Sequence, residues 1–230
     1  MKIIGFIGAY DKTDLLLNIA KVLITMNNRA LLVDSTINQK AKYVVPAINP
    51  TVSYITSFED IDVAVGFNDI NEIQKYSGTM NEVPYDILLV DCDSIERIQK
   101  FQLENASKNY FITSFDLYSL KKGLEILSNI DNQMNLTKVL FTKEMLKEDD
   151  EYLNYLSLGY KINWNDERIY FPIENGDLTV IAENQRLQKI RFRKLSVQYK
   201  DSIAFMVQQI LEEKSDSNIR KAIKIIEKGA

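Results

Sequence analysis

The chain has 230 residues, 46% of them apolar, which suits one large α/β domain or one domain with a short appendage. It contains no His and a single Cys, Cys92, so His-based triads, His metal sites and internal disulfides are excluded. The net charge of −4 argues against a globally basic nucleic-acid-binding protein. No spanning helix or signal peptide is evident, so we expect a cytoplasmic protein.

Short apolar runs alternate along the chain with segments of helical periodicity. Strands are predicted at 2–8, 29–35, 52–67 (a pair), 85–93, 108–115, 137–143, 168–173 and 178–183, and helices at 14–28, 70–77, 117–130, near 145–157 and at about 195–213. This alternation predicts a doubly wound, mostly parallel sheet flanked by helices on both faces, a P-loop NTPase-like α/β fold. We expect one domain over 1–212, then a polar linker and short helix over 213–230.

The first strand ends in a loop that is arranged like a phosphate-binding loop but lacks most of its glycines. The stretch IGFIGAYDKTDLLLNIAKVL (4–23) passes from an apolar run through Gly8 and the pair Lys12-Thr13 into a helix. Acids follow two other strands: Asp34 after ALLV, and Asp91 and Asp93 in the segment ILLVDCD. Ligands of doubly wound folds lie at the carboxyl ends of the strands, where these residues are expected.

The order and spacing of these segments resemble the MinD/ParA branch of P-loop ATPases over most of residues 1–212. RALLVDST is similar to that family's second strand with its acid, YDILLVDCDS to its Walker B segment, and ITSFDLYSLKKGLEIL to a later strand and helix. The resemblance implies that Lys12 contacts phosphate, that Thr13 and Asp91 hold magnesium, and that Asp34 and Asp91 organise water and metal. It also implies ATP and Mg as cofactors and a homodimer.

The departures from the family's loop, GKGGxGKT, point the other way. Aligned on Lys12-Thr13, Ile7 replaces the signature lysine, Gly8 is retained, and Ala9 and Asp11 replace glycines. Ala9 and Asp11 each add a Cβ where backbone N–H groups must approach phosphate, and Asp11 also adds a negative charge. Asp11 or Asp14 could instead cap the helix start from within the chain. In addition, LFTKEM (140–145) lacks the Asn that contacts the base in the family.

We therefore expect a degenerate nucleotide site over Gly8, Asp11, Lys12, Thr13 and Asp14, with very slow ATP hydrolysis or none and no bound cofactor. Two interpretations of Lys12-Thr13 remain open, an ordinary helix start and a residual phosphate site. For the strand-end acids the alternatives are polar turn residues and a true metal role. We expect Cys92 to be a small buried hydrophobe.

The last segment, IRKAIKIIEK (219–228), has an apolar and a basic face. Ile219, Ile223 and Ile226 share the apolar face, and Lys221 and Lys224 lie on the basic one. Such a helix can lie on anionic lipid, and MinD-like proteins use a C-terminal helix of this sort. The alternative that we favour is a last helix docked on the domain.

A basic segment, QRLQKIRFRKLSVQYK (185–200), precedes this tail. Arg186, Lys189, Arg191 and Arg193 are its candidates for nonspecific DNA binding, which ParA-like proteins perform in this general region. The acidic total of the chain makes a solvated helix face the favoured alternative.

Three functions compete. The first is a non-catalytic positioning or scaffold component of a secretion, pilus or division assembly, in the cytoplasm or peripheral at the membrane. The second is an ATP-dependent dimerisation switch, and the third is a DNA-partitioning protein. The chemistry of the loop favours the first.

Overall fold

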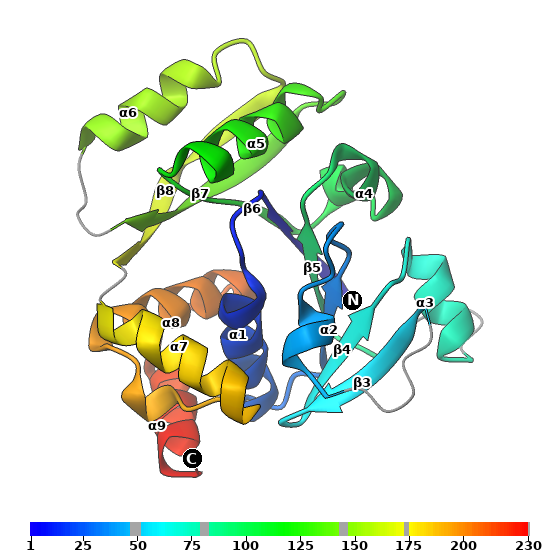
Figure 1. Ribbon diagram of the computed structural model, residues 1–230, viewed down its shortest axis with the longest axis vertical. Helices are drawn as coiled ribbons and strands as arrows, with labels where there is room; N and C mark the ends of the chain where they lie inside the picture. The colour runs from blue at the N-terminus through cyan, green and yellow to red at the C-terminus, as the bar shows by residue number, and fades with distance from the viewer. Residues whose placement is uncertain (47–51, 79–82, 143–146, 173–174, 230) are drawn as a thin grey trace.

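The computed structural model describes residues 1–46, 52–78, 83–142, 147–172 and 175–229 (Figure 1). The strands are β1 (Lys2–Ile7), β2 (Ala30–Asp34), β3 (Tyr54–Phe58), β4 (Ile61–Val65), β5 (Ile87–Cys92), β6 (Lys108–Ser114), β7 (Met134–Thr142) and β8 (Ile162–Pro172). The helices are α1 (Thr13–Thr25), α2 (Ala41–Val44), α3 (Ile70–Tyr76), α4 (Ile95–Lys100), α5 (Leu117–Ser128), α6 (Lys147–Leu156), α7 (Asn175–Leu187), α8 (Val197–Leu211) and α9 (Ser217–Gly229), with 3₁₀ turns η1 (Leu103–Asn105) and η2 (Phe192–Lys194).

The strands form one twisted sheet in the order β3-β4-β2-β5-β1-β6-β7-β8. Only β3 runs antiparallel to its neighbour, and every other adjacent pair in this sheet is parallel. The predicted doubly wound, mostly parallel sheet is therefore confirmed. Because β1 lies between β5 and β6, the chain order reverses beside it, and the loop after β1 opens at a point where such sheets bind ligands.

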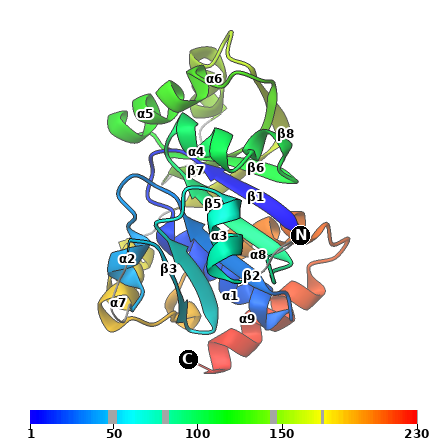
Figure 2. The ribbon, with the colours of Figure 1, turned by 90° about the vertical axis from the view of Figure 1, so that its right-hand side faces the viewer.

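Helices cover both faces of the sheet and bury two separate cores (Figures 1 and 2). Successive side chains of a strand point to opposite faces, so Ile4 and Phe6 of β1 enter one core while Ile3 and Ile7 enter the other. The first core is closed by α1, α7, α8 and α9, and the second by α3, α4, α5 and α6. Strands buried on both faces explain why their sequences are continuous apolar runs.

The strand predicted at 178–183 is wrong, because these residues form the middle of α7. Asp177, Val180 and Asn184 are buried while Leu178 and Thr179 are exposed, which is helical rather than alternating spacing. Asp177 accepts hydrogen bonds from the amide (2.7 Å) and hydroxyl (2.8 Å) of Ser196, and so fixes the start of α8 against α7. The β-branched pair Thr179 and Val180 was misleading, since short apolar runs do not distinguish strand from helix.

The C-terminal helix α9 is docked on the domain. Ile219, Ala222, Ile223 and Ile226 are buried in the first core, where α9 contacts α1, α8 and η2. Ion pairs from Lys200 to Glu227 (2.7 Å) and from Arg220 to Asp201 (2.8 Å) hold the same helix. The apolar face that was a candidate for membrane contact therefore lies inside the molecule in this arrangement.

Magnitudes favour this docked arrangement of α9. Burying an Ile side chain contributes about 1.5–3 kcal/mol relative to leaving it exposed. A Lys near an anionic membrane contributes about 1 kcal/mol, and Lys221 and Lys224 are exposed. Contact of the three Ile residues with lipid would require α9 to undock first. Among the described residues, every helix is too short or too polar to cross a bilayer.

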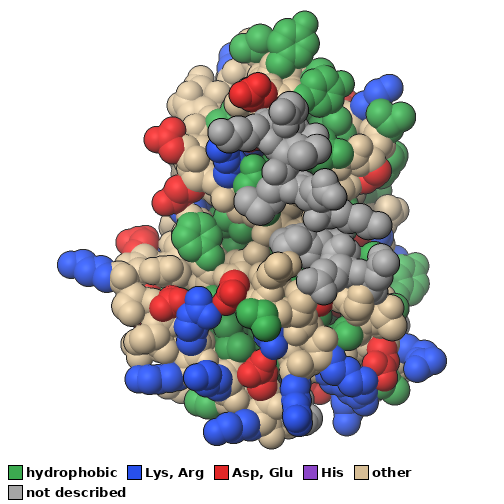
Figure 3. All heavy atoms as spheres, turned by 90° about the vertical axis from the view of Figure 1, so that its left-hand side faces the viewer, with side chains coloured by type: hydrophobic (Ala, Val, Ile, Leu, Met, Phe, Trp, Pro, Cys, Tyr) green, Lys and Arg blue, Asp and Glu red, His purple; other side chains and the backbone are tan. Residues whose placement is uncertain are grey.

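The C-terminal end of α9 lies far from α5 and α6 (Figures 1 and 2). Figure 3 shows Lys and Arg side chains gathered along the lower end of one face of the molecule. The loop after β1, which resembles a phosphate-binding loop, lies at the start of α1 and is a separate region from this basic surface.

Candidate functional site

The loop between β1 and α1 turns at Gly8, whose φ is +139°. The Gly8 amide donates to the carbonyl of Cys92 at 3.1 Å, which ties the turn to β5. A Cβ placed on Gly8 would lie 2.2 Å from the carbonyl oxygen of Ile112. The loop therefore retains a glycine at the one position where both the dihedral angle and the space demand it.

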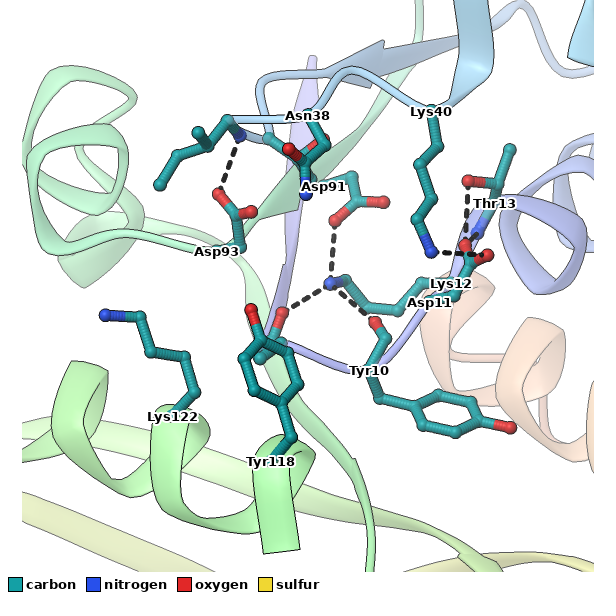
Figure 4. A pocket seen from close by; sticks show the side chains of 14 residues that line it. Tyr10, Asp11, Lys12, Thr13, Asn38, Lys40, Asp91, Asp93, Tyr118 and Lys122 are labelled. Atoms are coloured by element: carbon teal, nitrogen blue, oxygen red, sulfur yellow. Dashed lines mark hydrogen bonds and ion pairs between the residues drawn. The ribbon is translucent and has the colours of Figure 1, made fainter. Parts of the chain in front are cut away.

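The carboxylate of Asp11, one residue before the N-cap Lys12, binds the first residue of α1 (Figure 4). Its Oδ1 accepts from the backbone amide of Thr13 at 3.1 Å and from the Thr13 hydroxyl at 3.0 Å, and its Oδ2 pairs with Lys40 at 3.0 Å. Burial raises the pKa of Asp11, but the hydrogen bonds from Lys40 and Thr13 outweigh it and hold the pKa below its ordinary value. An ionised carboxylate of this chain therefore occupies a helix N-terminus that is suited to an anion.

Lys12 is buried and fully engaged. Its Nζ donates to the carbonyl oxygens of Gly8 (2.6 Å) and Tyr10 (3.2 Å) and pairs with Asp91 Oδ1 at 2.8 Å. The ammonium group thus donates two hydrogen bonds to loop carbonyls and forms an ion pair with Asp91, so all three of its contacts are with the chain itself. Figure 4 shows Lys12 at the centre of this cluster, pointing back into its own loop. The two residues expected to contact phosphate and magnesium, Lys12 and Thr13, are thus both held by internal partners.

The structure brings the strand-end acids together at the carboxyl edge of the sheet, where Asp34 and Asp91 are register partners on β2 and β5. Asp34 accepts from the amide and hydroxyl of Thr36 (3.0 and 2.6 Å) and from the amide of Ala41 (2.8 Å), so it organises the loop that leads into α2. Asp93 accepts from the amide of Ile37 at 2.9 Å in the same loop.

Asp91 is the most perturbed of these carboxyl groups. Burial raises its pKa to about 7, although the Lys12 ammonium pulls in the opposite direction. Next to it, burial raises the pKa of the Cys92 thiol to about 12, as expected for a small buried hydrophobe rather than a reactive cysteine.

The loop after β1, together with Asp91 and Asp93, lines a pocket of about 280 Å³. Besides the loop itself, its walls include Asn38, Lys40, Tyr118 and Lys122, and Figure 4 shows Tyr118 and Lys122 projecting from α5. The sequence analysis missed these four residues. Nothing in their local spacing marks them, because they reach the site from the loop between β2 and α2 and from α5.

An aromatic column holds the tip of the loop. The Tyr10 ring stacks on Phe141 at 4.5 Å, Phe141 stacks on Phe171 at 4.9 Å, and Phe171 meets the edge of Tyr199 at 5.1 Å. Each such pair contributes about 0.5–1.5 kcal/mol beyond area burial. Tyr10 thus anchors the loop to β7, β8 and α8. Of the stretch LFTKEM, residues 143–145 lie outside the described residues.

Asp14, in the first turn of α1, points away from the loop and accepts a hydrogen bond from Gln185 of α7. Burial raises its pKa to about 6, Gln185 opposes the shift, and Asp11 adds to it. Its folded pKa lies above the ordinary value, so the folded state holds this proton more tightly. The contribution of Asp14 to stability therefore falls as the pH rises from about 4 to about 6.

We expect Asp14→Asn to stabilise the protein at neutral pH by about 1–2 kcal/mol, less than the full shift implies because an acid in a first turn also gains from the helix dipole. Below about pH 4 the variant and parent should converge. Urea unfolding across this pH range measures the difference, and Asp166→Asn, at an exposed position, controls for the loss of charge. A gain that is independent of pH would contradict the assignment.

The basic candidates lie away from this pocket, between the end of α7 and η2. Arg191 and Lys194 both pair with Glu183, at 3.2 and 2.9 Å. Arg186, Lys189 and Arg193 are exposed. The structure thus places the DNA candidates together on one surface.

No family model and no curated protein matches this sequence. Solved structures do match. The chain is similar to MinD in a MinC:MinD cell division protein complex of Aquifex aeolicus (TM-score 0.61, 15% identity, 94% of this chain and 98% of that one). It is also similar to a ParA family ATPase of Chlorobium tepidum (0.54, 14%, 98% and 97%) and to pNOB8 ParA bound to nonspecific DNA (0.54, 14%, 93% and 99%).

At 14–15% sequence identity, the structural similarity shows the fold alone, and the chemistry of the site must be argued from this chain's own residues. The likeness extends over nearly the whole chain. The chain therefore has the fold of the MinD/ParA class of P-loop ATPases.

Proposed function

We propose that this chain is a non-catalytic MinD/ParA-like protein that acts as a positioning or scaffold component of a larger assembly and does not cycle on ATP. One observation carries the proposal: the Asp11 carboxylate accepts both the amide and the hydroxyl of Thr13. A phosphate group would need the Thr13 amide, since unpaired N–H groups at a helix start are what bind it.

Charge supports the same conclusion. The pocket contains Asp11, Asp91 and Asp93 against three cations, and Lys12 and Lys40 are already paired with two of these acids. The remaining cation, Lys122, pairs with Glu125 at 2.8 Å. A triphosphate placed here would meet carboxylates without gaining a free cation. The charges of this pocket therefore favour a site that does not hold a triphosphate.

The fold offers surfaces that a scaffold can use. One similar structure is a complex of MinD with MinC, so protein binding is compatible with this architecture. We expect protein partners, and we expect that a homodimer of this chain would form without nucleotide, since the signature lysine is replaced by Ile7 and that residue is buried in β1.

We expect calorimetric titration of the parent protein with Mg-ATP to show no binding with a dissociation constant below about 1 mM. Asp11→Gly frees the Thr13 donors and removes a charge, so we expect it to bind Mg-ATP at least about tenfold more tightly than the parent. Asp60→Gly is the matched control, because Asp60 lies in the β3–β4 turn with φ +67° and tolerates glycine. Micromolar binding with turnover by the parent protein would overturn the proposal and identify an ATP-dependent switch.

A further inference from the structure

A second and larger pocket, of about 620 Å³, lies at the other end of α1. Its walls are the β3–β4 turn at Glu59, the segment Lys189–Lys194, and the end of α9 at Gly229. Lys21, late in α1, contacts the same turn through the Glu59 carbonyl at 2.7 Å. The volume lies within the range of about 300–1,000 Å³ that is usual for small-molecule sites.

Four cationic side chains line this pocket: Lys189, Arg191, Arg193 and Lys194. Arg191 and Lys194 share the single carboxylate of Glu183. Within the described part of the chain, neither Lys189 nor Arg193 is paired with an acid. Among the described residues of the lining, Glu59 is the only acid, and its carboxylate already lies 3.9 Å from Lys21. The pocket therefore has excess positive charge on a protein whose net charge is −4.

The fold does not require this excess. The side chains of Lys189, Arg193 and Lys194 are exposed, and the segment is anchored instead by Ile190 and Phe192, which are buried in the first core. Like charges gathered at an edge of the molecule repel one another and lower stability. A bound anion would relieve that repulsion, and Arg and Lys are the side chains that bind phosphate groups.

We propose that this second pocket binds a small ligand that carries two or more phosphate groups close together. The site is independent of the loop after β1, so it stands whether or not that loop binds ATP. The concave shape and the buried Ile190 wall favour a compact ligand over duplex DNA, whose phosphates are spread along a rod and are best met by an extended basic surface. The same phosphate chemistry can come from a soluble metabolite or from a lipid headgroup.

The test uses the full chain and inorganic tripolyphosphate as the probe, titrated by calorimetry at low salt. We expect binding that weakens as salt is added. The double variant Lys189→Gln/Arg193→Gln removes the two cations that lack an acidic partner, and we expect it to bind at least about tenfold more weakly. The matched control is Lys221→Gln/Lys224→Gln, which removes two exposed charges from α9 outside the pocket. It should bind like the parent, and neither variant should unfold at a lower temperature than the parent, because the Lys189→Gln/Arg193→Gln change relieves repulsion.

Further arms separate the possible outcomes. Binding that survives in the Lys189→Gln/Arg193→Gln variant but is lost in Thr13→Val would overturn this proposal, and the proposed function with it. Tighter binding of a 30-base-pair duplex than of tripolyphosphate, growing with duplex length, would also overturn it in favour of DNA. Phosphatidylcholine vesicles with and without a bisphosphorylated lipid distinguish a lipid headgroup from a soluble ligand. If only the vesicles that contain the bisphosphorylated lipid retain the protein, and tripolyphosphate releases it, the ligand is a headgroup. If the protein binds tripolyphosphate but neither kind of vesicle, the ligand is soluble.

Discussion

We expect the Lys12→Met protein to be less stable than the parent chain by about 3–5 kcal/mol, because the substitution leaves a buried carboxyl group without its cation. Lys12 and Asp91 are 2% and 4% exposed, so water cannot replace the lost partner. Asp91 would then fold in its protonated form, and two loop carbonyls, of Gly8 and Tyr10, would lose their donor.

Urea or guanidinium unfolding at about pH 8, above the pKa of about 7 that burial gives Asp91, measures this loss, and a double-mutant cycle assigns it to the pair. Asp91→Asn should cost less than Lys12→Met, because Lys12 keeps its two carbonyl acceptors. The variant that combines both changes should be more stable than Lys12→Met alone by about 1–3 kcal/mol, since the orphaned acid is gone. A Lys12→Met protein within about 1 kcal/mol of the parent would mean that Asp91 is solvated or paired elsewhere.

Gly8→Ala is the second substitution with a large expected effect. The backbone at Gly8 has φ +139°, which an L side chain rarely adopts, and the new Cβ would meet the Ile112 carbonyl at 2.2 Å. Conformational strain of about 1–3 kcal/mol and overpacking of about 1–3 kcal/mol together predict a loss of about 2–6 kcal/mol. The oxygen belongs to the backbone of β6 and cannot rotate away.

Thermal and chemical unfolding of Gly8→Ala test this expectation beside Gly176→Ala. Gly176 lies in the first turn of α7 with ordinary dihedrals and no atom within 4 Å of its added Cβ. Alanine there should be neutral or stabilising by up to about 1 kcal/mol. Equal effects of the two substitutions would show that the loop relaxes freely at Gly8.

Much of the fold was predictable because burial on both faces leaves a strong sequence signal. β1, β2 and β5 are continuous apolar runs that end at Gly8, Asp34 and Asp91, and the sheet places those ends side by side. The hydrophobic pattern predicts less well where an element is buried on one side only. The β-branched residues of α7 predict a strand but form a helix. The strand β8 begins at Ile162, earlier than its apolar run predicts, within a polar stretch that carries Trp164.

The candidate site was predictable as far as local chain geometry determines it. Asp11 lies two residues before Thr13, so its contact with the start of α1 follows from the sequence alone. Lys40 lies 29 residues from Asp11 and reaches it only because β2 and its loop lie beside β1 and β5 in the folded sheet. Tyr10 was unremarkable in sequence, since its stacking partner Phe141 comes from β7.

Two ion pairs hold the loop after β1, one exposed and one buried, and they should differ in their response to salt. The Asp11–Lys40 pair has side chains 41% and 51% exposed, whereas those of Asp91 and Lys12 are 6% and 2% exposed. Mobile ions screen charges that face water within about 8–10 Å at ordinary ionic strength, and they reach buried pairs far less. Raising the electrolyte concentration should therefore weaken the Asp11–Lys40 ion pair and leave the Lys12–Asp91 pair almost unchanged. The segment around Lys40 would then respond to ionic strength independently of the rest of the fold.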